Sequence, residues 1–417
     1  MSATNGTNGP SRGRADETGN APPLRLFVVA GEHSGDALGA KLMAALKARA
    51  GRPVVFQGVG GEHMAAEGLA SLFPLSEVAV MGPVNIVKGL PRLIGRVFDT
   101  VDAAFHADVD AVVIIDSPEF THPIARRIRG MRPGLPIVDY VSPSVWAWRP
   151  GRARRMKRYV DHVLALLPFE PAAHTRLGGP ACTYVGHPLV ERLPWIDALD
   201  PRVLADRLAL DPQRPVLVVL PGSRSSEVSR LMQPFGDTVA RLAASGTTPE
   251  VVIPTVASVR PLIEQRLADW RLPPAVRVHL VAGEEDKFRA FRLARAALAA
   301  SGTVTLELAL AGTPMVVAYK VDAVAARLRF LLKVHSIVLA NLVLGENAFP
   351  ELIQEDCVPD RLAPALAALL GEGPERAAQL AALARIRAIM TSGIASPSAA
   401  AADVVLAEVA KQRAIRA

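Results

Sequence analysis

The sequence has few cysteines, few aromatic residues and no long apolar runs, and each shortage excludes a class of protein. Its 417 residues include two cysteines, Cys182 and Cys357, too few for a disulfide scaffold or a four-cysteine zinc site. Aromatic residues make up 5%, which argues against base-stacking platforms, so nucleic acid is not an expected partner. No uncharged apolar run reaches the roughly 18 residues of a membrane span, and no transmembrane helix is expected.

What the sequence does contain is typical of a large globular protein. Hydrophobic residues make up 50% and charged residues 21%, and the length suggests two or three domains. Residues 1–23 have no apolar segment of the kind found in secretory signals, and their Gly, Asn, Ser, Thr and Pro content predicts a disordered tail. The net charge of +7 either has no consequence or indicates an anionic partner, such as a phosphate-bearing substrate or an anionic lipid.

Short β-branched runs alternate with Ala/Leu-rich stretches in two successive series. The first series predicts strands over Leu24–Ala30, Pro53–Gln57, Ala111–Ile115, Pro136–Val141, His162–Leu166 and Thr183–Val185. The second predicts strands over Val216–Leu220, Glu250–Pro254, Arg277–Val281, Ala296–Ala300 and Pro314–Tyr319. Helices are predicted over Ala37–Arg49, Ser225–Ala243, Thr303–Ala311 and Ser396–Arg416.

These series predict an α/β fold of two doubly wound parallel-sheet domains in tandem, because continuous Val/Ile runs are typical of strands covered on both faces. The expected domains are residues 24–195 and 196–395, and a last helix, about 396–417, can pack back on the first. Ligands of such folds bind at the carboxyl ends of the strands, so the expected site is a cleft between the domains.

The first strand leads into the sequence Gly31–Asp36 and then a helix. Its glycines are spaced GxxxG and no GK[ST] follows, so ordinary dinucleotide or ATP binding is not supported. One interpretation is a plain turn capped by Ser34 or Asp36. The other is a ligand site in which Glu32 points into the cleft.

Two further motifs follow strands in the first half. Asp116 comes directly after Ala111–Ile115, where a carboxylate can act as a general base on a hydroxyl or cap the next helix. Trp146 lies in the sequence Ser142–Arg149, where it can flank a sugar or acyl chain or pack in the core.

Two segments combine cations with apolar residues or helical character. Residues 149–158 contain six Arg and Lys, which suits a solvated helix face or contact with phosphate or an anionic membrane. Val80–Phe98 interleaves apolar residues with Lys88, Arg92 and Arg96, which suits an interfacial membrane segment or a buried helix pair.

The second half repeats the pattern of strand, glycine and helix. Gly222, Ser223 and Arg224 predict a phosphate cradle at a helix start. A second helix start of this kind follows another predicted strand and comprises Ser301, Gly302, Thr303 and Glu307. Its N–H and hydroxyl groups suit a diphosphate, and the Glu307 carboxylate suits ribose hydroxyls. Amides and carboxylates that can bind ligand or cap a helix follow at Asn341, Asn347, Glu351 and Gln354. No HExxH, close Cys/His pair or GxSxG occurs, so neither a zinc site nor a hydrolase triad is expected.

Taken in order, these motifs resemble those of the lipid-A-disaccharide synthase family. The resemblance covers about residues 25–410 and rests on Gly31–Asp36, Gly58–Gly61, Met81-Gly82, Ile115–Phe120, Ser144–Trp148, Gly186–Leu189, Leu220–Arg224, Ser301–Thr303 and Asn341-Leu342. His33 and Glu346-Asn347 depart from the residues that are frequent in the family.

The resemblance implies a glycosyltransferase of the GT-B fold, with two Rossmann-like domains, that is inverting and needs no metal or other cofactor. The implied reaction transfers 2,3-diacylglucosamine from UDP-2,3-diacylglucosamine to the 6-hydroxyl of 2,3-diacylglucosamine 1-phosphate (lipid X). The products are the β-1,6 lipid A disaccharide 1-phosphate and UDP. The family works peripherally at the cytoplasmic face of the Gram-negative inner membrane and can form homodimers by exchanging C-terminal elements.

The resemblance also implies roles for individual residues. Asp116 is the expected general base, and Glu32 is the competing candidate. The expected UDP-sugar site comprises Gly222, Ser223, Arg224, Ser301, Gly302, Thr303, Glu307, Asn341, Asn347, Glu351 and Gln354. The expected acceptor and lipid site comprises Gly31, Ser34, Gly35, Met81, Val84, Val87, Lys88, Trp146, Arg152 and Arg155.

Two alternatives stay open at this point. One is another GT-B enzyme acting on UDP-sugars, such as a UDP-N-acetylglucosamine 2-epimerase or the N-acetylglucosaminyl transferase of peptidoglycan lipid intermediates. The other is a non-catalytic, nucleotide-binding membrane adaptor, which would bind UDP without turnover.

Overall fold

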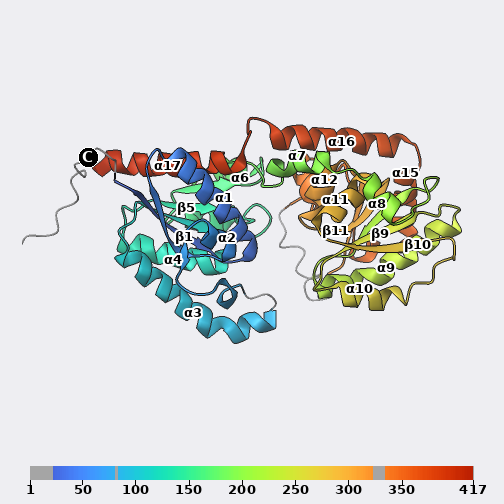
Figure 1. Ribbon diagram of the computed structural model, residues 1–417, viewed down its shortest axis with the longest axis horizontal. Coiled ribbons are helices and arrows are strands. Elements are labelled where there is room, and N and C mark those ends of the chain that lie inside the picture. The colour runs from blue at the N-terminus through green and yellow to red at the C-terminus, as the bar shows by residue number, and fades with distance from the viewer. Residues whose placement is uncertain (1–21, 80–82, 323–333, 417) are drawn as a thin grey trace, which may run out of the picture.

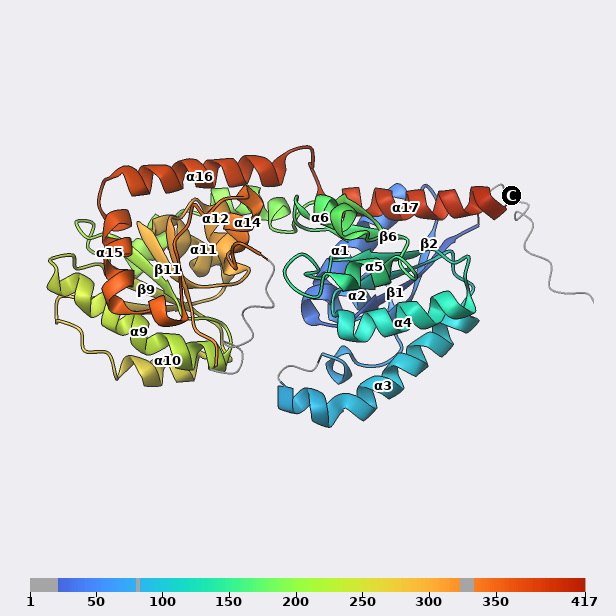
Figure 2. The same cartoon turned by 180° about the vertical axis from the view of Figure 1, so that it is seen from behind.

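The computed structural model describes residues 22–79, 83–322 and 334–416, with the side chains of 83–89 and 416 outside the description. These ranges form two lobes, each a parallel sheet with helices on both faces (Figure 1). The first lobe is built on strands β1–β7 and the second on β8–β13. Figure 2 shows the lobes from behind, with helices α16 and α17 running along one side of both.

The sheet of the first lobe has the order β3-β2-β1-β4-β5-β6-β7. Its strands are β1 Leu24–Ala30, β2 Val54–Val59, β3 Ala70–Ser71, β4 Ala111–Ile115, β5 Ile137–Tyr140, β6 His162–Ala165 and β7 Ala181–Tyr184. Its helices are α1 His33–Arg49, α2 Glu62–Ala66, α3 Pro83–His106, α4 Pro118–Met131, α5 Gly151–Met156 and α6 Glu170–Leu177. One face of the sheet is buried by α1, and the other by α3 and α4.

The sheet of the second lobe has the order β10-β9-β8-β11-β12-β13. Its strands are β8 Val216–Leu220, β9 Glu250–Thr255, β10 Arg277–Ala282, β11 Ala296–Ala300, β12 Met315–Tyr319 and β13 Glu351–Ile353. Its helices are α7 Leu193–Ala198, α8 Arg202–Arg207, α9 Ser225–Ala244, α10 Arg260–Leu267, α11 Glu284–Leu293, α12 Val304–Ala311, α14 Leu339–Leu344, α15 Pro359–Leu370 and α16 Pro374–Thr391. Strands β4, β8 and β11 coincide with their predicted bounds because each is a continuous buried run.

The last helix, α17 (Pro397–Arg416), lies against α1 of the first lobe. Its Ala401, Val405 and Val409 belong to the same buried cluster as the α1 side chains. An ion pair between Arg49 and Asp403 adds to this contact. The predicted domain limits stay a prediction; the boundary at 195/196 falls inside α7.

Two local predictions are wrong. The turn predicted over Gly31–Asp36 is shorter, because α1 begins at His33 and the Asp36 N–H already donates to the Glu32 carbonyl. Asp36 does not cap its own helix. Its carboxylate accepts hydrogen bonds from the backbone N–H groups of Gly61, His63 and Met64, at 2.7–3.1 Å, and so caps α2.

The sequence predicts an interfacial stretch or a helix pair over Val80–Phe98. Residues 80–82 of this segment lie outside the described residues, and the part from Pro83 on belongs to one helix, α3, which runs through Pro91. Its Val97 and Val101 are buried, whereas Leu90, Ile94 and Phe98 are exposed. Among the described residues, none of the helices has the length and apolar character needed to cross a bilayer.

Candidate active site

The end of β4 lies in direct contact with the turn after β1. Asp116 and Ser117 both have left-handed backbone angles, with φ of 53° and 46°, which is costly for residues other than glycine. The Thr121 hydroxyl donates to the carbonyls of Asp116 and Ser117, at 2.7 and 3.1 Å, and holds this conformation. A side chain at Gly31 would overlap Ser117, so glycine is required for the two segments to meet.

Both candidate bases have raised pKa values, and the charge of Asp116 contributes to the shift of Glu32. Burial raises the pKa of Asp116, and the charges of Asp139 and Glu119 act in the same direction, whereas the hydrogen bond from the Ser117 N–H lowers it. Burial and the charge of Asp116 raise the pKa of Glu32, and the guanidinium of Arg224 lowers it. Arg224 belongs to the second lobe, so the two lobes bring their predicted site residues within electrostatic reach.

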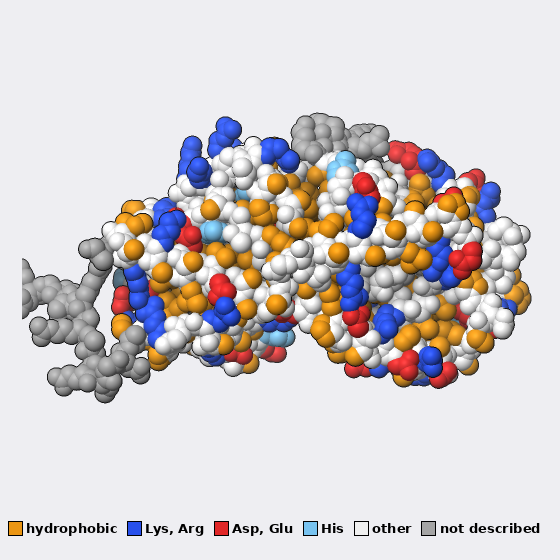
Figure 3. All heavy atoms as spheres, turned by 90° about the horizontal axis from the view of Figure 1, so that it is seen from above, with side chains coloured by type: hydrophobic (Ala, Val, Ile, Leu, Met, Phe, Trp, Pro, Cys, Tyr) orange, Lys and Arg blue, Asp and Glu red, His pale blue; other side chains and the backbone are white. Residues whose placement is uncertain are grey.

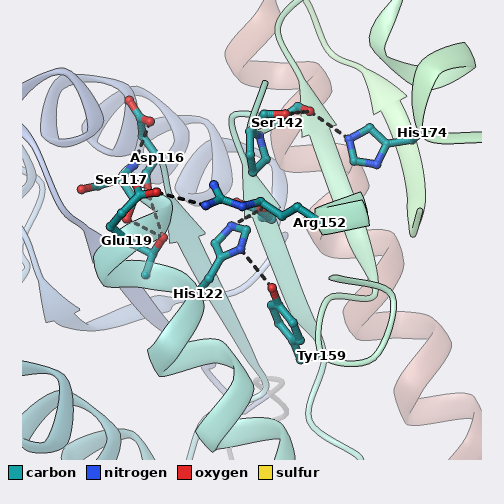
Figure 4. Close-up of polar contacts among 11 residues, drawn as sticks. Asp116, Ser117, Glu119, His122, Ser142, Arg152, Tyr159 and His174 are labelled. Atoms are coloured by element: carbon teal, nitrogen blue, oxygen red, sulfur yellow. Dashed lines mark hydrogen bonds and ion pairs between the residues drawn. The ribbon is translucent and has the colours of Figure 1, made fainter. Parts of the chain in front are cut away.

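A buried polar pair, His122 on α4 and Asp139 on β5, lies on the α4 face of the sheet; Figure 4 labels His122 together with Asp116 and Tyr159. His122 Nε2 lies 3.2 Å from Asp139 Oδ2, and both side chains are almost fully buried. The Tyr159 hydroxyl lies 3.1 Å from the other ring nitrogen, Nδ1. Asp139 is therefore one source of the negative charge that makes Asp116 harder to ionise.

The Trp146 loop is fixed by a second buried carboxyl. The Trp146 indole N–H donates to Glu170 Oε1 at 3.0 Å, and the Leu167 N–H donates to Oε2 at 2.9 Å. Burial raises the pKa of Glu170 to about 7, against the effect of these hydrogen bonds. Trp146 also packs edge-on against Phe169, so its ring is half-buried among protein groups.

The other predicted acceptor residues are more scattered. Gly35 is buried, Ser34 and Arg155 are exposed, and Arg152 pairs with Glu119 at 3.1 Å (Figure 4). Met81 lies outside the described residues, as do the side chains of three predicted residues on α3: Val84, Val87 and Lys88.

A cavity of about 900 Å³ lies at the carboxyl ends of the second lobe's strands. Seven predicted residues line it: Gly222, Ser223, Arg224, Ser301, Gly302, Thr303 and Glu307. Its size suits a nucleotide-sized ligand, and its position is the one expected for ligands of parallel sheets.

Glu227, which sequence reasoning missed, organises one wall of this cavity. Its Oε2 accepts hydrogen bonds from the N–H groups of Ser223 and Arg224, at 3.1 and 3.3 Å. The Tyr319 hydroxyl donates to its Oε1 at 3.1 Å. Gly222 has φ of 112°, and a side chain there would approach the Glu227 Cβ within 2.5 Å. The Ser223 and Arg224 N–H groups of the predicted phosphate cradle therefore already donate to Glu227. The Arg224 side chain is 69% exposed.

Lys287 is a second cavity residue that sequence reasoning missed. Its ammonium lies 3.0 Å from Glu307 Oε1, which fixes the predicted ribose carboxylate beside a cation. Lys287 comes from α11, which begins after β10 and Gly283. This is the same pattern of strand, glycine and helix as in the recognised motifs, and it could have indicated Lys287.

Four predicted UDP-sugar residues do not line this cavity. Asn341 donates to Glu351 at 2.8 Å and also bonds the backbone of Phe349, so it ties α14 to β13. Gln354 accepts a hydrogen bond from the Val321 N–H at 2.7 Å, and Asn347 is exposed. Their binding roles stay predictions.

Comparison with known sequences decides which family this site serves. The lipid-A-disaccharide synthetase family matches residues 26–404, across both lobes. The lipid-A-disaccharide synthase of Rhodopseudomonas palustris (strain HaA2) is 54% identical over 383 residues, which cover 92% of this chain and 95% of that protein. The chain belongs to the lipid-A-disaccharide synthetase family. It is therefore a glycosyltransferase, as the resemblance implied.

Solved structures confirm the predicted fold class. A UDP-GlcNAc 2-epimerase from Neisseria meningitidis, bound to UDP-GlcNAc, superposes with a TM-score of 0.61 at 11% identity, covering 93% of this chain and 100% of that one. Acinetobacter baumannii MurG superposes with a TM-score of 0.54 at 12% identity and the same coverage. At such identities the likeness is one of fold, the GT-B arrangement of two Rossmann-like lobes. The Rhodopseudomonas palustris relative, at 54% identity, is what distinguishes the lipid-A-disaccharide synthetase family from the epimerase and MurG, which share only the fold.

Proposed function

We propose that this protein transfers 2,3-diacylglucosamine from UDP-2,3-diacylglucosamine to the 6-hydroxyl of lipid X, giving the β-1,6 disaccharide 1-phosphate and UDP. The observation that carries the proposal is the family match over residues 26–404, which includes both the Asp116 turn and the cavity of the second lobe. A transferase of this kind needs an acceptor base in one lobe and a nucleotide site in the other.

In the proposed mechanism, Asp116 accepts the proton of the acceptor 6-hydroxyl. The freed oxygen attacks the anomeric carbon of the donor sugar, and the bond from that carbon to the UDP oxygen breaks. Attack opposite the leaving group inverts the configuration and gives the β linkage. Arg224 and the start of α12 (Val304–Ala311) stabilise the charge that develops on the diphosphate. Glu32 is the competing base.

The surface of the first lobe supports a peripheral position on the cytoplasmic face of an inner membrane. Leu90, Ile94 and Phe98 recur every fourth residue of α3 and are 46%, 48% and 53% exposed. The Arg127 guanidinium lies over the Phe98 ring, 4.8 Å from its centroid, and an exposed apolar stripe beside a cation favours the interface of a bilayer. Figure 3 views the molecule from the side of α16 and α17 and shows groups of Lys and Arg side chains on the first lobe; α3 lies on the side away from this view, so these cations are not part of the stripe.

A homodimer formed by exchange of C-terminal elements remains part of the proposal. In the single chain, α17 packs on its own α1. Exchange would replace this contact by the same contact with the partner's helix, at no loss of buried apolar surface.

The deciding experiment is a direct assay. The purified protein is mixed with UDP-2,3-diacylglucosamine and lipid X in mild detergent with EDTA, and the products are followed by mass spectrometry. A disaccharide phosphate is expected. UDP binding without product would favour the non-catalytic adaptor, and product that appears only after Mg²⁺ is added would contradict metal independence.

Replacing Glu307 with glutamine is expected to weaken UDP binding about tenfold, because a charged hydrogen-bond acceptor for the ribose is lost. Isothermal titration calorimetry measures this change. The loss should shrink with 2′-deoxy-UDP, which lacks one of the hydroxyls concerned. Glu346→Gln, an exposed carboxylate paired with Arg385, is the control. Equal losses for UDP and 2′-deoxy-UDP would contradict the ribose contact.

Ile94→Glu is expected to lower binding to vesicles of phosphatidylethanolamine and phosphatidylglycerol about tenfold or more, because burial of one such side chain contributes about 1.5–3 kcal/mol. Sedimentation with the vesicles measures the bound fraction. Leu380→Glu, on α16 and 41% exposed, is the matched control and should bind as the wild type does. Unchanged binding of Ile94→Glu would mean that α3 is not the membrane contact.

A further inference from the structure

A second cavity, of about 840 Å³, lies at the opposite edge of the second lobe's sheet from the nucleotide cavity. It is formed where β8 and β11 begin, whereas the nucleotide cavity lies where these strands end. Its charged lining consists of two aspartates and five arginines, Asp206, Asp211, Arg202, Arg214, Arg292, Arg295 and Arg376. We call it the arginine cavity. The lining carries an excess of three positive charges, which favours an anion.

Backbone carbonyls hold several of these guanidinium groups in place. Arg292 uses a single nitrogen, Nη1, to bond the carbonyls of Ile196, Asp197 and Leu199. Arg376 likewise uses Nη1 to bond the carbonyls of Leu369 and Arg295. Their Nε and Nη2 groups make no hydrogen bond or ion pair within the described ranges. Each side chain is thus fixed, with charged donors left over, and a fixed donor loses little entropy when it binds a ligand.

Counting Glu372, which lies outside the lining but pairs with Arg295, five arginines face three carboxylates and an excess of two positive charges remains. Arg214 pairs with Asp211, and Arg295 pairs with Glu372. Arg202 is exposed, and its side chain has no partner among the residues that the structure describes. Burial and the charge of Arg295 lower the pKa of Arg376, as expected where like charges converge.

We propose that the arginine cavity binds a soluble phosphate-class anion, at a site separate from the nucleotide cavity. Arginine is suited to this ligand because its planar fork donates two parallel hydrogen bonds to phosphate oxygens. The inference does not depend on the proposed transferase reaction.

The test is calorimetric titration of the full chain with inorganic pyrophosphate at fixed ionic strength, with and without saturating UDP. One site that persists in the presence of UDP is expected. Arg202→Gln should weaken it several-fold, and Arg376→Gln about tenfold, as for the loss of a charged hydrogen bond. The Arg202 side chain makes no contact on which the stability of the fold depends. The Arg202→Gln variant is therefore informative even if Arg376→Gln fails to fold.

Arg207→Gln is the matched control, since it removes the same charge from the same helix, α8, but Arg207 pairs with Asp286 and does not line the cavity. Its pyrophosphate affinity should equal that of the wild type. Loss of the site when UDP is added would overturn the proposal, because the anion would then occupy the nucleotide cavity. Equal weakening by Arg202→Gln and Arg207→Gln would also overturn it. If Arg202→Gln instead lost binding to phosphatidylglycerol vesicles, the ligand would be a lipid headgroup and not a soluble anion.

Discussion

Replacing Asp116 with asparagine is expected to lower kcat about 100- to 10,000-fold, the usual range for loss of a general base. Asparagine accepts left-handed backbone angles as readily as aspartate, so the turn at φ 53° should survive. The change therefore removes the proton acceptor and leaves its position intact. The disaccharide assay measures kcat, and circular dichroism checks the fold.

The control is Asp108→Asn, an aspartate that is 90% exposed and precedes the same strand, β4. It should keep wild-type turnover. If Asp116→Asn retains near-normal kcat and Glu32→Gln loses it, the base is Glu32.

The pH profile gives an independent check on the base. The base works when ionised, so activity falls as the pH drops through its pKa. Because burial raises the pKa of Asp116, this fall should begin at a higher pH than for an ordinary aspartate. Asp139→Asn, which removes one neighbouring negative charge, should move the acid limb to lower pH.

Replacing Gly58 with alanine is expected to destabilise the first lobe by more than about 3 kcal/mol. Gly58 pairs with Val28 in the β1–β2 ladder and has φ of 136°. A Cβ there would overlap the Val28 carbonyl, 2.8 Å from its carbon, so β1 and β2 would have to separate. Urea unfolding followed by circular dichroism measures the loss.

Gly51→Ala separates the two causes of this loss. Gly51 also has a positive φ, of 62°, but a side chain there would meet nothing within 4 Å. Its variant should lose only about 1–2 kcal/mol, the cost of the left-handed angle. Similar losses at both positions would show that the backbone angle, and not the clash, decides the stability.

The sequence was most informative where a feature depends on one continuous segment. The strand Val216–Leu220 could be predicted from its continuous apolar run. The glycine turns at Gly222 and Gly302, which precede α9 and α12, could be predicted from the local pattern of strand, glycine and helix. Contacts between distant segments left no such signal. Nothing near Asp36 indicates that it caps α2. Glu227 is a different case, because it binds N–H groups only three and four residues before it, and the local pattern of a helix start could have indicated it.

The same limit explains the scattered predictions near the end of the second lobe. Asn341 and Glu351 are ten residues apart and have the polarity of ligand-binding groups. Their hydrogen bond to each other, and those to the neighbouring backbone, appear only once β13 has joined the sheet beside β12. Residue type alone does not distinguish a polar group that binds ligand from one that completes a loop.

The packing of α17 on α1 also determines the order in which the two lobes can finish folding during synthesis. The first lobe holds residues from both ends of the chain, and Val405 and Val409 fill its core beside Leu42 and Leu46. On the ribosome, the second lobe has its full set of helices and strands before α17 emerges. The lobe that is synthesised first must therefore be finished last, and a chain truncated before residue 397 would keep an apolar face of α1 open to chaperones and proteases.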